Sequence, residues 1–500
     1  MGQLAMTLGQ LLEGSGVTSS VPAGAALEEV RGIAYDSRKA GPGFVFFAFP
    51  GARTDGRQFA ESAVEKGALA VISESAAPDG FPGLWLTATQ ARQTLATVSG
   101  RFYNHPDRHI HLFGITGTNG KTTTGYLLDS IFRQAGKTTA LVGTIEYRLA
   151  GRTLPAVNTT PESTDLFALF AELREHGGTH ATMEVSSHAL ALGRVHAMEF
   201  HTAVFTNLTR DHLDFHRTME EYFAAKQRLF LMEGAAGPRF AVINHDGEWG
   251  RSIRTKPGTE VLSYGLEAGA AARAVRIGSG FQGLRFEIQY DSHSYPVEST
   301  LAGRINVYNI LAAWCGAISD GLSPEIAAEG IRALQAVPGR FERVDEGQPF
   351  LVAVDYAHTD DALRNTIATA RALTSKGRVI TLFGCGGDRD RAKRPMMGAA
   401  AAEASDFVVL TSDNPRSENP LDIINDAMVG LRRFDTPHIV EPDRAAAIDA
   451  ALREARAGDV VILAGKGHEN YQVLKDRTIH FDDRETAVAV LRRLGYGKAA

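Results

Sequence analysis

The segment most able to do chemistry is residues 114–124, which read Gly-Ile-Thr-Gly-Thr-Asn-Gly-Lys-Thr-Thr-Thr. The apolar residues 110–113 before it predict a strand, and residues 122–134 predict a helix. Glycines let the backbone turn tightly enough to direct several N–H groups at one polyphosphate, and the start of a helix adds a favourable dipole. Lys121 would neutralise the terminal phosphates and the Thr122 hydroxyl would bind Mg²⁺. The pattern predicts a site for ATP or GTP.

The match to a phosphate-binding loop is imperfect. A strict Walker loop has glycine five positions before Gly120, where this chain has Ile115. A glycine-rich turn between a strand and a helix, without a ligand, therefore stays open as the alternative. The loop alone also leaves open what the nucleotide would drive.

Changes of pattern along the chain indicate two domain boundaries. Residues 1–108 contain short β-type runs around a predicted helix, and end in a polar segment with Pro106. In residues 109–337 strands alternate with helices, as is typical of a parallel sheet with crossover connections. Within this part, residues 273–297 have a period of two, which predicts antiparallel strands laid on the main sheet.

Residues 338–500 form the third part. Four apolar runs recur there with helical segments between them, which predicts a second doubly wound α/β unit. The expected fold is α/β with three domains, at residues 1–108, 109–337 and 338–500.

Composition excludes several classes of protein. The 500 residues carry 52 Lys and Arg against 58 Asp and Glu, a net charge of −6, whereas a general nucleic-acid binder has a strong basic excess. Only two cysteines occur, Cys315 and Cys385, so a disulfide framework is not expected. No apolar run approaches the roughly 18 residues that span a bilayer. We expect a cytoplasmic monomer that binds small molecules, neither binds nucleic acid nor inserts into membranes, and folds as a globular chain.

Residues 117–122, Gly-Thr-Asn-Gly-Lys-Thr, resemble the nucleotide loop of the Mur ligases and folylpolyglutamate synthetases. Further motifs of that family follow in its order: Asn158-Thr-Thr-Pro161, Met183-Glu-Val-Ser-Ser-His188, residues 206–214, residues 222–228, Asn306-Val-Tyr-Asn309, Gly339-Arg-Phe-Glu342 and Asp355-Tyr-Ala-His358. Because these motifs cover nearly the whole chain, it is identified as a member of the Mur ligase family. The resemblance implies a UDP-binding N-terminal domain, a central P-loop ATPase domain with a parallel sheet, and a C-terminal Rossmann-like domain.

The resemblance also implies ATP and Mg²⁺ as cofactors and assigns residues to them. The implied ATP-binding residues are Gly117, Thr118, Asn119, Gly120, Lys121, Thr122, Thr123, Asn306, Asn309, Arg340, Asp355 and His358. The implied metal ligands are Thr122, Glu184, His212 and Lys226, and the implied catalytic residues are Lys121, Glu184, His212 and Lys226.

Lys226 carries the most demanding of these roles. Taken alone, it is most simply a solvated lysine on a helix predicted over residues 219–231. The family carbamylates the matching lysine, which turns a cation into a carboxylate-like Mg²⁺ ligand, and a bare ammonium could not do this. For His188, a structural hydrogen bond and a ligand role remain equally open.

The implied reaction is phosphoryl transfer from ATP to a substrate carboxylate, followed by capture of the acyl phosphate by an amine. The implied binding residues for a UDP-muramyl-dipeptide are Ser37, Arg38, Asn158, Thr159, Thr160, Ser186 and Arg194. Residues 36–38, Asp-Ser-Arg, could alone be a simple turn. The chain departs from the family at Leu192, where relatives often have glutamine, so one substrate hydrogen bond is in doubt.

A motif near the C-terminus, Asp413-Asn-Pro-Arg416, resembles that of Mur ligases that add meso-diaminopimelate rather than lysine. The implied diaminopimelate-binding residues are Arg389, Asp413, Asn414, Pro415, Arg416, Gly465 and Glu469. Arginine's planar fork can pair with the second carboxylate of diaminopimelate, which lysine lacks. Without the resemblance, Arg389 is better explained as a surface charge in a dense charged run.

Three other functions compete with this interpretation. The same reaction with L-lysine is the nearest. A folylpolyglutamate synthetase is disfavoured because that family does not share the uridine-binding domain. A nucleotide-dependent switch or motor would hydrolyse ATP without making an amide, and the balanced charge and two end domains argue against it.

Overall fold

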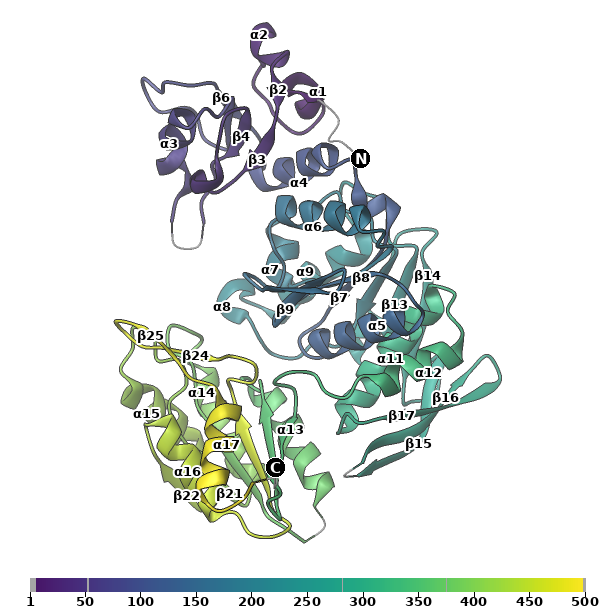
Figure 1. Cartoon of the computed structure of the whole chain (residues 1–500), viewed down its shortest axis with the longest axis vertical. Coiled ribbons are helices and arrows are strands. Elements are labelled where there is room, and N and C mark those ends of the chain that lie inside the picture. Colours follow the sequence, from purple (N-terminus) through teal and green to yellow (C-terminus); the bar gives the residue numbers. More distant parts are fainter. Residues whose placement is uncertain (1–5, 52–53, 281, 375, 498–500) are drawn as a thin grey trace.

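The computed structural model describes residues 6–51, 54–280, 282–374 and 376–497. Three α/β units follow one another along the molecule, each built on its own main sheet (Figure 1). The three-part α/β fold expected from the sequence is confirmed. Among the described residues, no helix combines the length and the apolar character needed to cross a membrane.

The first unit contains a four-stranded parallel sheet in the order β3-β4-β5-β6 and a small antiparallel pair, β1 and β2. The strands are β1 (Met6–Thr7), β2 (Glu29–Val30), β3 (Gly32–Ala34), β4 (Phe44–Phe47), β5 (Ala70–Ser73) and β6 (Trp85–Thr87). The helices are α1 (Leu8–Leu12), α2 (Ala23–Ala26), α3 (Ala60–Glu65) and α4 (Ala91–Phe102), with 3₁₀ turns η1 (Ser37–Lys39), η2 (Gly56–Phe59) and η3 (Pro106–His109). The helix α4 packs against α6 of the central unit (Figure 1).

The central unit is built on an eleven-stranded sheet in the order β10-β9-β8-β11-β7-β12-β13-β14-β15-β16-β17. The strands are β7 (His111–Thr116), β8 (Thr139–Val142), β9 (Glu146–Leu149), β10 (Arg152–Pro155), β11 (His180–Glu184), β12 (Thr202–Phe205), β13 (Phe240–Asn244), β14 (Glu260–Gly265), β15 (Ala272–Gly280), β16 (Gly283–Tyr290) and β17 (His293–Ser299). The helices are α5 (Lys121–Gln134), α6 (Ser163–Glu175), α7 (Ser187–Ala191), α8 (Leu213–His216), α9 (Met219–Leu231), α10 (Glu248–Arg251), α11 (Arg304–Ser319) and α12 (Pro324–Ala333).

Helices cover both faces of this sheet. The helices α5, α11 and α12 lie on one face, and α6, α7 and α9 lie on the other (Figure 1). The side chains of each group form a separate apolar core with the face they cover. Along β7, Phe113 and Ile115 enter the first core and Leu112 enters the second. A strand buried on both faces is apolar at successive positions, which is why β7 is a continuous apolar run in the sequence.

The antiparallel segment predicted at residues 273–297 exists, but not where the sequence analysis put it. Strands β15, β16 and β17 pair antiparallel to one another, as expected. However, β15 pairs in parallel with β14, so these strands extend the edge of the main sheet and do not lie on it. A two-residue period reports that one face of a strand is buried and cannot tell which element covers it.

The third unit contains a six-stranded sheet in the order β18-β19-β23-β20-β21-β22, with only β18 antiparallel to its neighbour. The strands are β18 (Glu342–Val344), β19 (Leu351–Asp355), β20 (Val379–Phe383), β21 (Phe407–Leu410), β22 (His438–Val440) and β23 (Val460–Ala464), and a hairpin is formed by β24 (Tyr471–Val473) and β25 (Thr478–His480). The helices are α13 (Asp360–Leu373), α14 (Lys393–Ala404), α15 (Pro420–Leu431), α16 (Arg444–Glu454) and α17 (Asp483–Arg493).

A buried ion pair joins two helices of this unit to its sheet. Arg444 on α16 and Asp483 on α17 are both fully buried, and Arg444 Nη2 lies 2.6 Å from Asp483 Oδ2. The same guanidinium donates to the carbonyl oxygens of Ser412 at 3.2 Å and Ala464 at 3.0 Å. These carbonyls directly precede residues 413–416 and Gly465, so Arg444 holds the starts of both loops.

Removing the charge of Asp483 should destabilise the third unit, because it leaves a buried guanidinium unpaired. We expect Asp483→Asn to lower the free energy of opening of the third unit by about 3–5 kcal/mol. Hydrogen exchange of the β23 amides measures this quantity within a multidomain chain. The control Asp449→Asn breaks exposed pairs with Arg453 and Arg493 and should cost under about 1 kcal/mol. Equal effects of the two substitutions would contradict the assignment.

Candidate active site

The phosphate loop connects β7 to α5 and has no room for side chains at two of its glycines. Gly117 and Gly120 have φ values of 146° and 89°, which L side chains rarely adopt. A Cβ at Gly117 would lie 1.9 Å from Thr206 Oγ1, and one at Gly120 would lie 2.3 Å from Asn309 Oδ1. Both glycines are therefore required for the loop to approach the neighbouring segments.

The segment after β12 supports this loop through hydrogen bonds. The Asn119 amide donates to Asn207 Oδ1 at 2.9 Å, and Thr206 Oγ1 donates to the Asn119 carbonyl at 2.6 Å. Lys121 Nζ donates to the carbonyls of Gly117 and Thr118 at 2.9 and 2.8 Å. The loop is thus ordered by the chain itself, and its lysine lies directly over it.

A cavity of about 1030 Å³ opens beside the loop and is lined by residues of all three units. The residues singled out in the sequence that line it are Thr118, Asn119, Gly120, Lys121, Thr122, Thr123, Asn158, Thr159, Thr160, Glu184, Ser186, Arg194, His212, Lys226, Asn306, Asn309, Arg340, Asp355, His358 and Arg389, together with His188 and Leu192. Most of the implied ATP, metal and dipeptide residues therefore share one space.

Glu184 is the last residue of β11, and it is aligned with Ile115 of the neighbouring β7. Its side chain is only 2% exposed. The carboxylate accepts hydrogen bonds from the Thr144 amide at 2.9 Å and the Thr144 hydroxyl at 3.0 Å. Thr144 was not singled out in the sequence, although its place just after β8 puts it at the carboxyl edge of the sheet, where ligands bind in α/β folds.

His212 also lines the cavity and has two aromatic neighbours. Its ring centroid is 4.9 Å from that of His188 and 6.0 Å from that of Tyr222. Desolvation lowers the pKa of His212 to about 3, so its imidazole is neutral and has a lone pair to offer. His188 also packs on Phe215 with centroids 4.2 Å apart, and burial lowers its pKa as well.

Lys226 lies on α9, and its side chain is 1% exposed. Its amine donates to the Gly117 carbonyl at 2.7 Å and lies 4.6 Å from the centre of the Tyr222 ring. The pKa of Lys226 is lowered well below its ordinary value, first by burial and then by the charge of Lys121. The interpretation of Lys226 as a solvated helix lysine is therefore wrong.

The third unit reaches the phosphate loop directly. Arg340 Nη2 donates to Thr122 Oγ1 at 3.2 Å, and Asn119 Nδ2 donates to Asp361 Oδ2 at 2.9 Å. Lys393 Nζ donates to Asp211 Oδ1 at 3.1 Å, next to His212. Asp361 and Lys393 were missed in the sequence, and Asp211 entered only as part of the motif at residues 206–214, since nothing local to them indicates a contact with another unit.

The other implied nucleotide residues mostly support one another. Asp355 accepts from the Phe341 amide at 2.7 Å, the Ala357 amide at 2.9 Å and the Thr366 hydroxyl at 2.9 Å. These bonds fix the chain around Arg340 and His358. Asn309 Nδ2 donates to Asn306 Oδ1 at 2.9 Å, which orients both amides below Gly120.

The implied dipeptide residues Asn158, Thr159 and Thr160 pass beside the strand that carries Glu184. Thr160 Oγ1 donates to the Glu184 carbonyl at 2.9 Å and accepts from the Ser186 amide at 3.0 Å. Thr159 Oγ1 lies 3.0 Å from Thr144 Oγ1. These contacts place the segment at the wall of the cavity next to the implied metal ligand.

A chain of charges joins the first unit to this wall. Arg194 Nε donates to Glu162 Oε1 at 2.9 Å, and Arg92 on α4 has its Nε 3.6 Å from the same oxygen. Arg92 also lines the cavity and was missed in the sequence, because only the fold brings α4 to it. Ser37 and Arg38 do not line this cavity; Arg38 is exposed and its Nη2 lies 2.6 Å from Asp36.

The residues implied in diaminopimelate binding gather in the third unit, beside the large cavity. Arg416 is half-buried and its Nη1 donates to the Gly387 carbonyl at 2.7 Å. Burial and then the charge of Arg389 lower the pKa of Arg416, so two guanidinium groups repel each other there. Arg389 is exposed, as a surface charge would be, and it also lines the large cavity.

A polar network forms the rest of this cluster. Asn414 Nδ2 donates to Glu469 Oε2 at 2.8 Å, and the fully buried Lys466 places its amine 3.3 Å from the same carboxylate oxygen. Burial and the Asp413 carboxylate raise the pKa of Glu469. The loops after β20, β21 and β23 approach closely here. A Cβ at Gly465 would lie 2.7 Å from Asp413 Oδ2, and one at Gly387 would lie 1.9 Å from the Pro415 carbonyl oxygen.

Comparison with known proteins gives three matches to one family. The Mur ligase family catalytic domain matches residues 29–91, the Mur ligase middle domain residues 115–317, and the Mur ligase glutamate ligase domain residues 339–467. The three matches fall in the three structural units.

Individual relatives match over almost their whole length. A protein of Solibacter usitatus (strain Ellin6076), called UDP-N-acetylmuramoyl-L-alanyl-D-glutamate–2,6-diaminopimelate ligase, is 62% identical over 491 residues, which are 98% of this chain and 99% of the relative. A protein of the same name from Geobacillus thermodenitrificans (strain NG80-2) is 43% identical over 468 residues, covering 93% and 95%. A solved structure of that name is 31% identical, with a TM-score of 0.71, and covers 99% of this chain and 100% of the solved chain. This chain belongs to the Mur ligase family.

Proposed function

We propose that this protein is an ATP-dependent ligase that joins meso-2,6-diaminopimelate to UDP-N-acetylmuramoyl-L-alanyl-D-glutamate, a step of peptidoglycan precursor synthesis. One observation carries the proposal. The phosphate loop, the buried Lys226 and the exposed Arg389 line a single cavity. The names of the relatives at 62% and 43% identity support the choice of substrates.

The first step is phosphoryl transfer. A carboxylate of the dipeptide attacks the γ-phosphorus of ATP, the bond to the β,γ-bridging oxygen breaks, and ADP leaves. Lys121, already held over the loop by the Gly117 and Thr118 carbonyls, stabilises charge on the phosphoryl oxygens. Arg340 lies against Thr122 and can add a second cation from the third unit.

The second step is amide formation. The amine of diaminopimelate attacks the carbonyl carbon of the acyl phosphate, the tetrahedral intermediate expels phosphate, and the amine proton is lost. In these two reaction steps no side chain of the protein serves as a nucleophile. The contribution of the protein is to position the amine near the activated carboxyl group, which alone can supply several kcal/mol of rate acceleration.

The residues around the loop fit Mg²⁺. Thr122 offers a hydroxyl oxygen and Glu184 a buried carboxylate, which are the hard oxygen ligands that Mg²⁺ prefers. His212 offers a neutral imidazole, and Lys226 would hold a second ion once it is carbamylated. When bound, Mg²⁺ supplies neutralisation of charge on the transferring phosphoryl group.

Carbamylation suits the surroundings of Lys226. The reaction requires the neutral amine: its nitrogen attacks the carbon of CO₂, an N–C bond forms, one C=O bond becomes C–O⁻, and a proton goes to solvent. Burial favours the neutral amine here. The product is an anion near Lys121, so the repulsion between two lysines becomes an attraction.

The cluster around Arg416 suits an amino acid with a second carboxylate. Arg416 and Arg389 present two guanidinium groups whose mutual repulsion an incoming carboxylate would relieve. Glu469 and Asp413 lie in the same cluster and can pair with an ammonium. Lysine would leave the guanidinium pair without an anion, which a site of this kind penalises strongly.

A product assay tests the proposal directly. Given ATP, Mg²⁺ and the UDP-linked dipeptide, the purified protein should release phosphate and form the tripeptide with meso-diaminopimelate at least ~100-fold more efficiently than with L-lysine, because of the unpaired guanidinium groups. Mass spectrometry of the product identifies the amino acid added. A preference for lysine would refute the specificity, and ATP hydrolysis without any amide product would refute the ligase assignment.

Replacing Arg416 tests the distal carboxylate contact. Arg416→Lys keeps a positive charge but loses the planar fork, so the KM for meso-diaminopimelate should rise about 10–100-fold, as expected for the loss of one charged hydrogen bond. The KM for ATP should change less than about twofold. The control Arg391→Lys alters an exposed arginine paired with Asp426 and should leave both constants unchanged. Equal shifts of both constants in Arg416→Lys would remove this role.

Labelling tests the modification of Lys226. Protein incubated with ¹³C-bicarbonate at neutral pH should show one carbamate signal by ¹³C NMR, since burial makes the neutral amine available there. The signal should disappear in Lys226→Arg and persist in Lys256→Arg, whose lysine is bound to the Met232 and Ala235 carbonyls away from the site. A signal that survives Lys226→Arg would place the carbamate on another lysine.

A further inference from the structure

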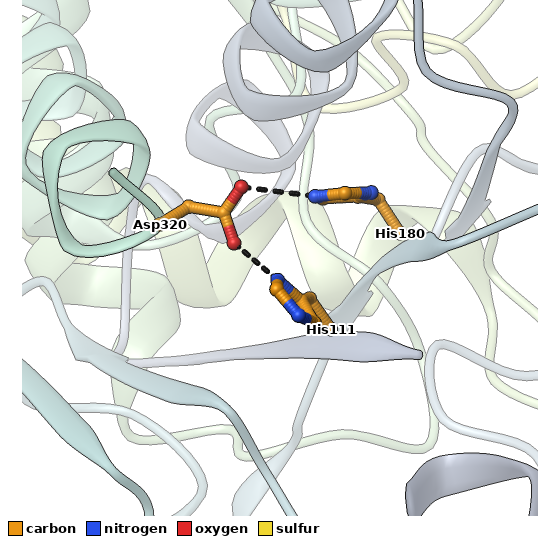
Figure 2. Close-up of side chains that lie close together, drawn as sticks. All are labelled: His111, His180 and Asp320. Carbon is orange, nitrogen blue, oxygen red and sulfur yellow. Dashed lines mark hydrogen bonds and ion pairs between the residues drawn. The ribbon is translucent and has the colours of Figure 1, made fainter. Parts of the chain in front are cut away.

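Two histidines and an aspartate meet where the central strands start, whereas the phosphate loop lies where they end. His111 is the first residue of β7 and His180 the first of β11, and the two are directly aligned across these parallel strands. Asp320 directly follows α11. Figure 2 shows the Asp320 carboxylate pointing between the two imidazole rings.

The ligand atoms of this cluster are close together. His111 Nδ1 lies 2.5 Å from Asp320 Oδ1, and His180 Nε2 lies 2.9 Å from Asp320 Oδ2 (Figure 2). One ligand atom from each residue lies within 4.8 Å of the other two. The side chains of His180 and Asp320 are buried at 4% and 3% exposure, whereas that of His111 is 50% exposed. Two of the three ligand side chains, His180 and Asp320, are therefore enclosed by the protein, and the third, His111, reaches the surface.

Neighbouring groups orient both rings. His180 Nδ1 lies 2.7 Å from the Thr179 hydroxyl, which can accept its proton and leave the Nε2 lone pair available. His111 is stacked on His201, with ring centroids 4.4 Å apart and planes 5° apart. A metal-binding histidine typically donates its other ring N–H to a neighbouring polar group, as His180 can do here.

The cluster opens to a separate cavity of about 500 Å³. This cavity is lined by His111, His201 and Asp320, together with Glu260 of β14 and Tyr290 of β16. An ion could enter from this side, and water could occupy a coordination position left open by the protein. A metal site requires both the ligands and such an entry path.

We propose that His111, His180 and Asp320 form a zinc site, with His111 Nδ1, His180 Nε2 and one Asp320 oxygen as ligands and water in the fourth position. Two imidazoles and a carboxylate are a ligand set that Zn²⁺ accepts. Tetrahedral bonds of ~2.0–2.1 Å separate the ligand atoms by ~3.3 Å. The 2.5 Å contact between His111 Nδ1 and Asp320 Oδ1 must therefore lengthen by about 0.8 Å when the ion binds. Each coordinating nitrogen gives up its proton, and the other nitrogen of the same ring then carries one.

Such a site would link three elements that lie far apart in the amino-acid sequence. The starts of β7 and β11 and the end of α11 would be held together at the base of the sheet, below the strand that leads into the phosphate loop. Because an ion that binds only the folded state stabilises it by mass action, zinc should raise the melting temperature of the central unit. The site lies at the starts of the strands and the phosphate loop at their ends, so the two sites are separate.

The test is zinc binding to the full-length, tag-free protein after chelator treatment. Isothermal titration calorimetry should detect one Zn²⁺ ion bound per protein molecule. The affinity of the protein for this ion should fall at least about tenfold in His111→Gln and in Asp320→Asn. Zinc should raise the melting temperature of the unsubstituted protein by several degrees, and this increase should be lost in both variants. His111 is half exposed, so His111→Gln should fold even if Asp320→Asn does not.

His109→Gln is the matched control, since His109 is exposed, lies two residues from His111 and is outside the cluster. It should bind zinc as the unsubstituted protein does. Failure of the unsubstituted protein to bind zinc, or undiminished binding by His111→Gln, would overturn the proposal and leave Asp320 as the acceptor of two histidine hydrogen bonds. The ligase assay is a separate readout, so failure here does not bear on the proposed reaction.

Discussion

Lys226 places its amine inside the protein, against the carbonyl oxygen of Gly117, and the active site is organised around this contact. The two residues are 109 positions apart in the chain, so the contact fixes α9 against the phosphate loop. Burying a charged amine with one carbonyl as its hydrogen-bond partner is costly. The cost falls if the amine is neutral, and neutrality is also the state in which it can react with CO₂. Position and reactivity therefore have the same physical origin.

A second constraint is that the three units share the phosphate loop and its surroundings. The first unit contributes Arg92 through Glu162, and the third contributes Arg340 to Thr122 and Asp361 to Asn119. The first unit also packs its α4 against α6, whereas the third unit contacts the phosphate loop through single polar bonds. Interfaces of this kind let units move relative to one another.

The sequence predicted the parts of the site that depend on local pattern. The loop at residues 117–122 and the helix at 219–231 have signals within a few residues, and both are present in the structure. Thr144, Asp361 and Arg92 gave no such signal, because their partners are 40 or more positions away in the chain. The edge position of β15–β17 was likewise set by pairing with β14, which the period of two cannot report.

The starts and the ends of the central strands have different chemistry for a geometric reason. In a parallel sheet all strands end on one side, so backbone N–H groups, helix starts and polar loops gather there and bind anions. The strands begin on the other side, where His111 and His180 are brought into register by the same pairing that aligns Ile115 with Glu184. One strand pair therefore sets both sites.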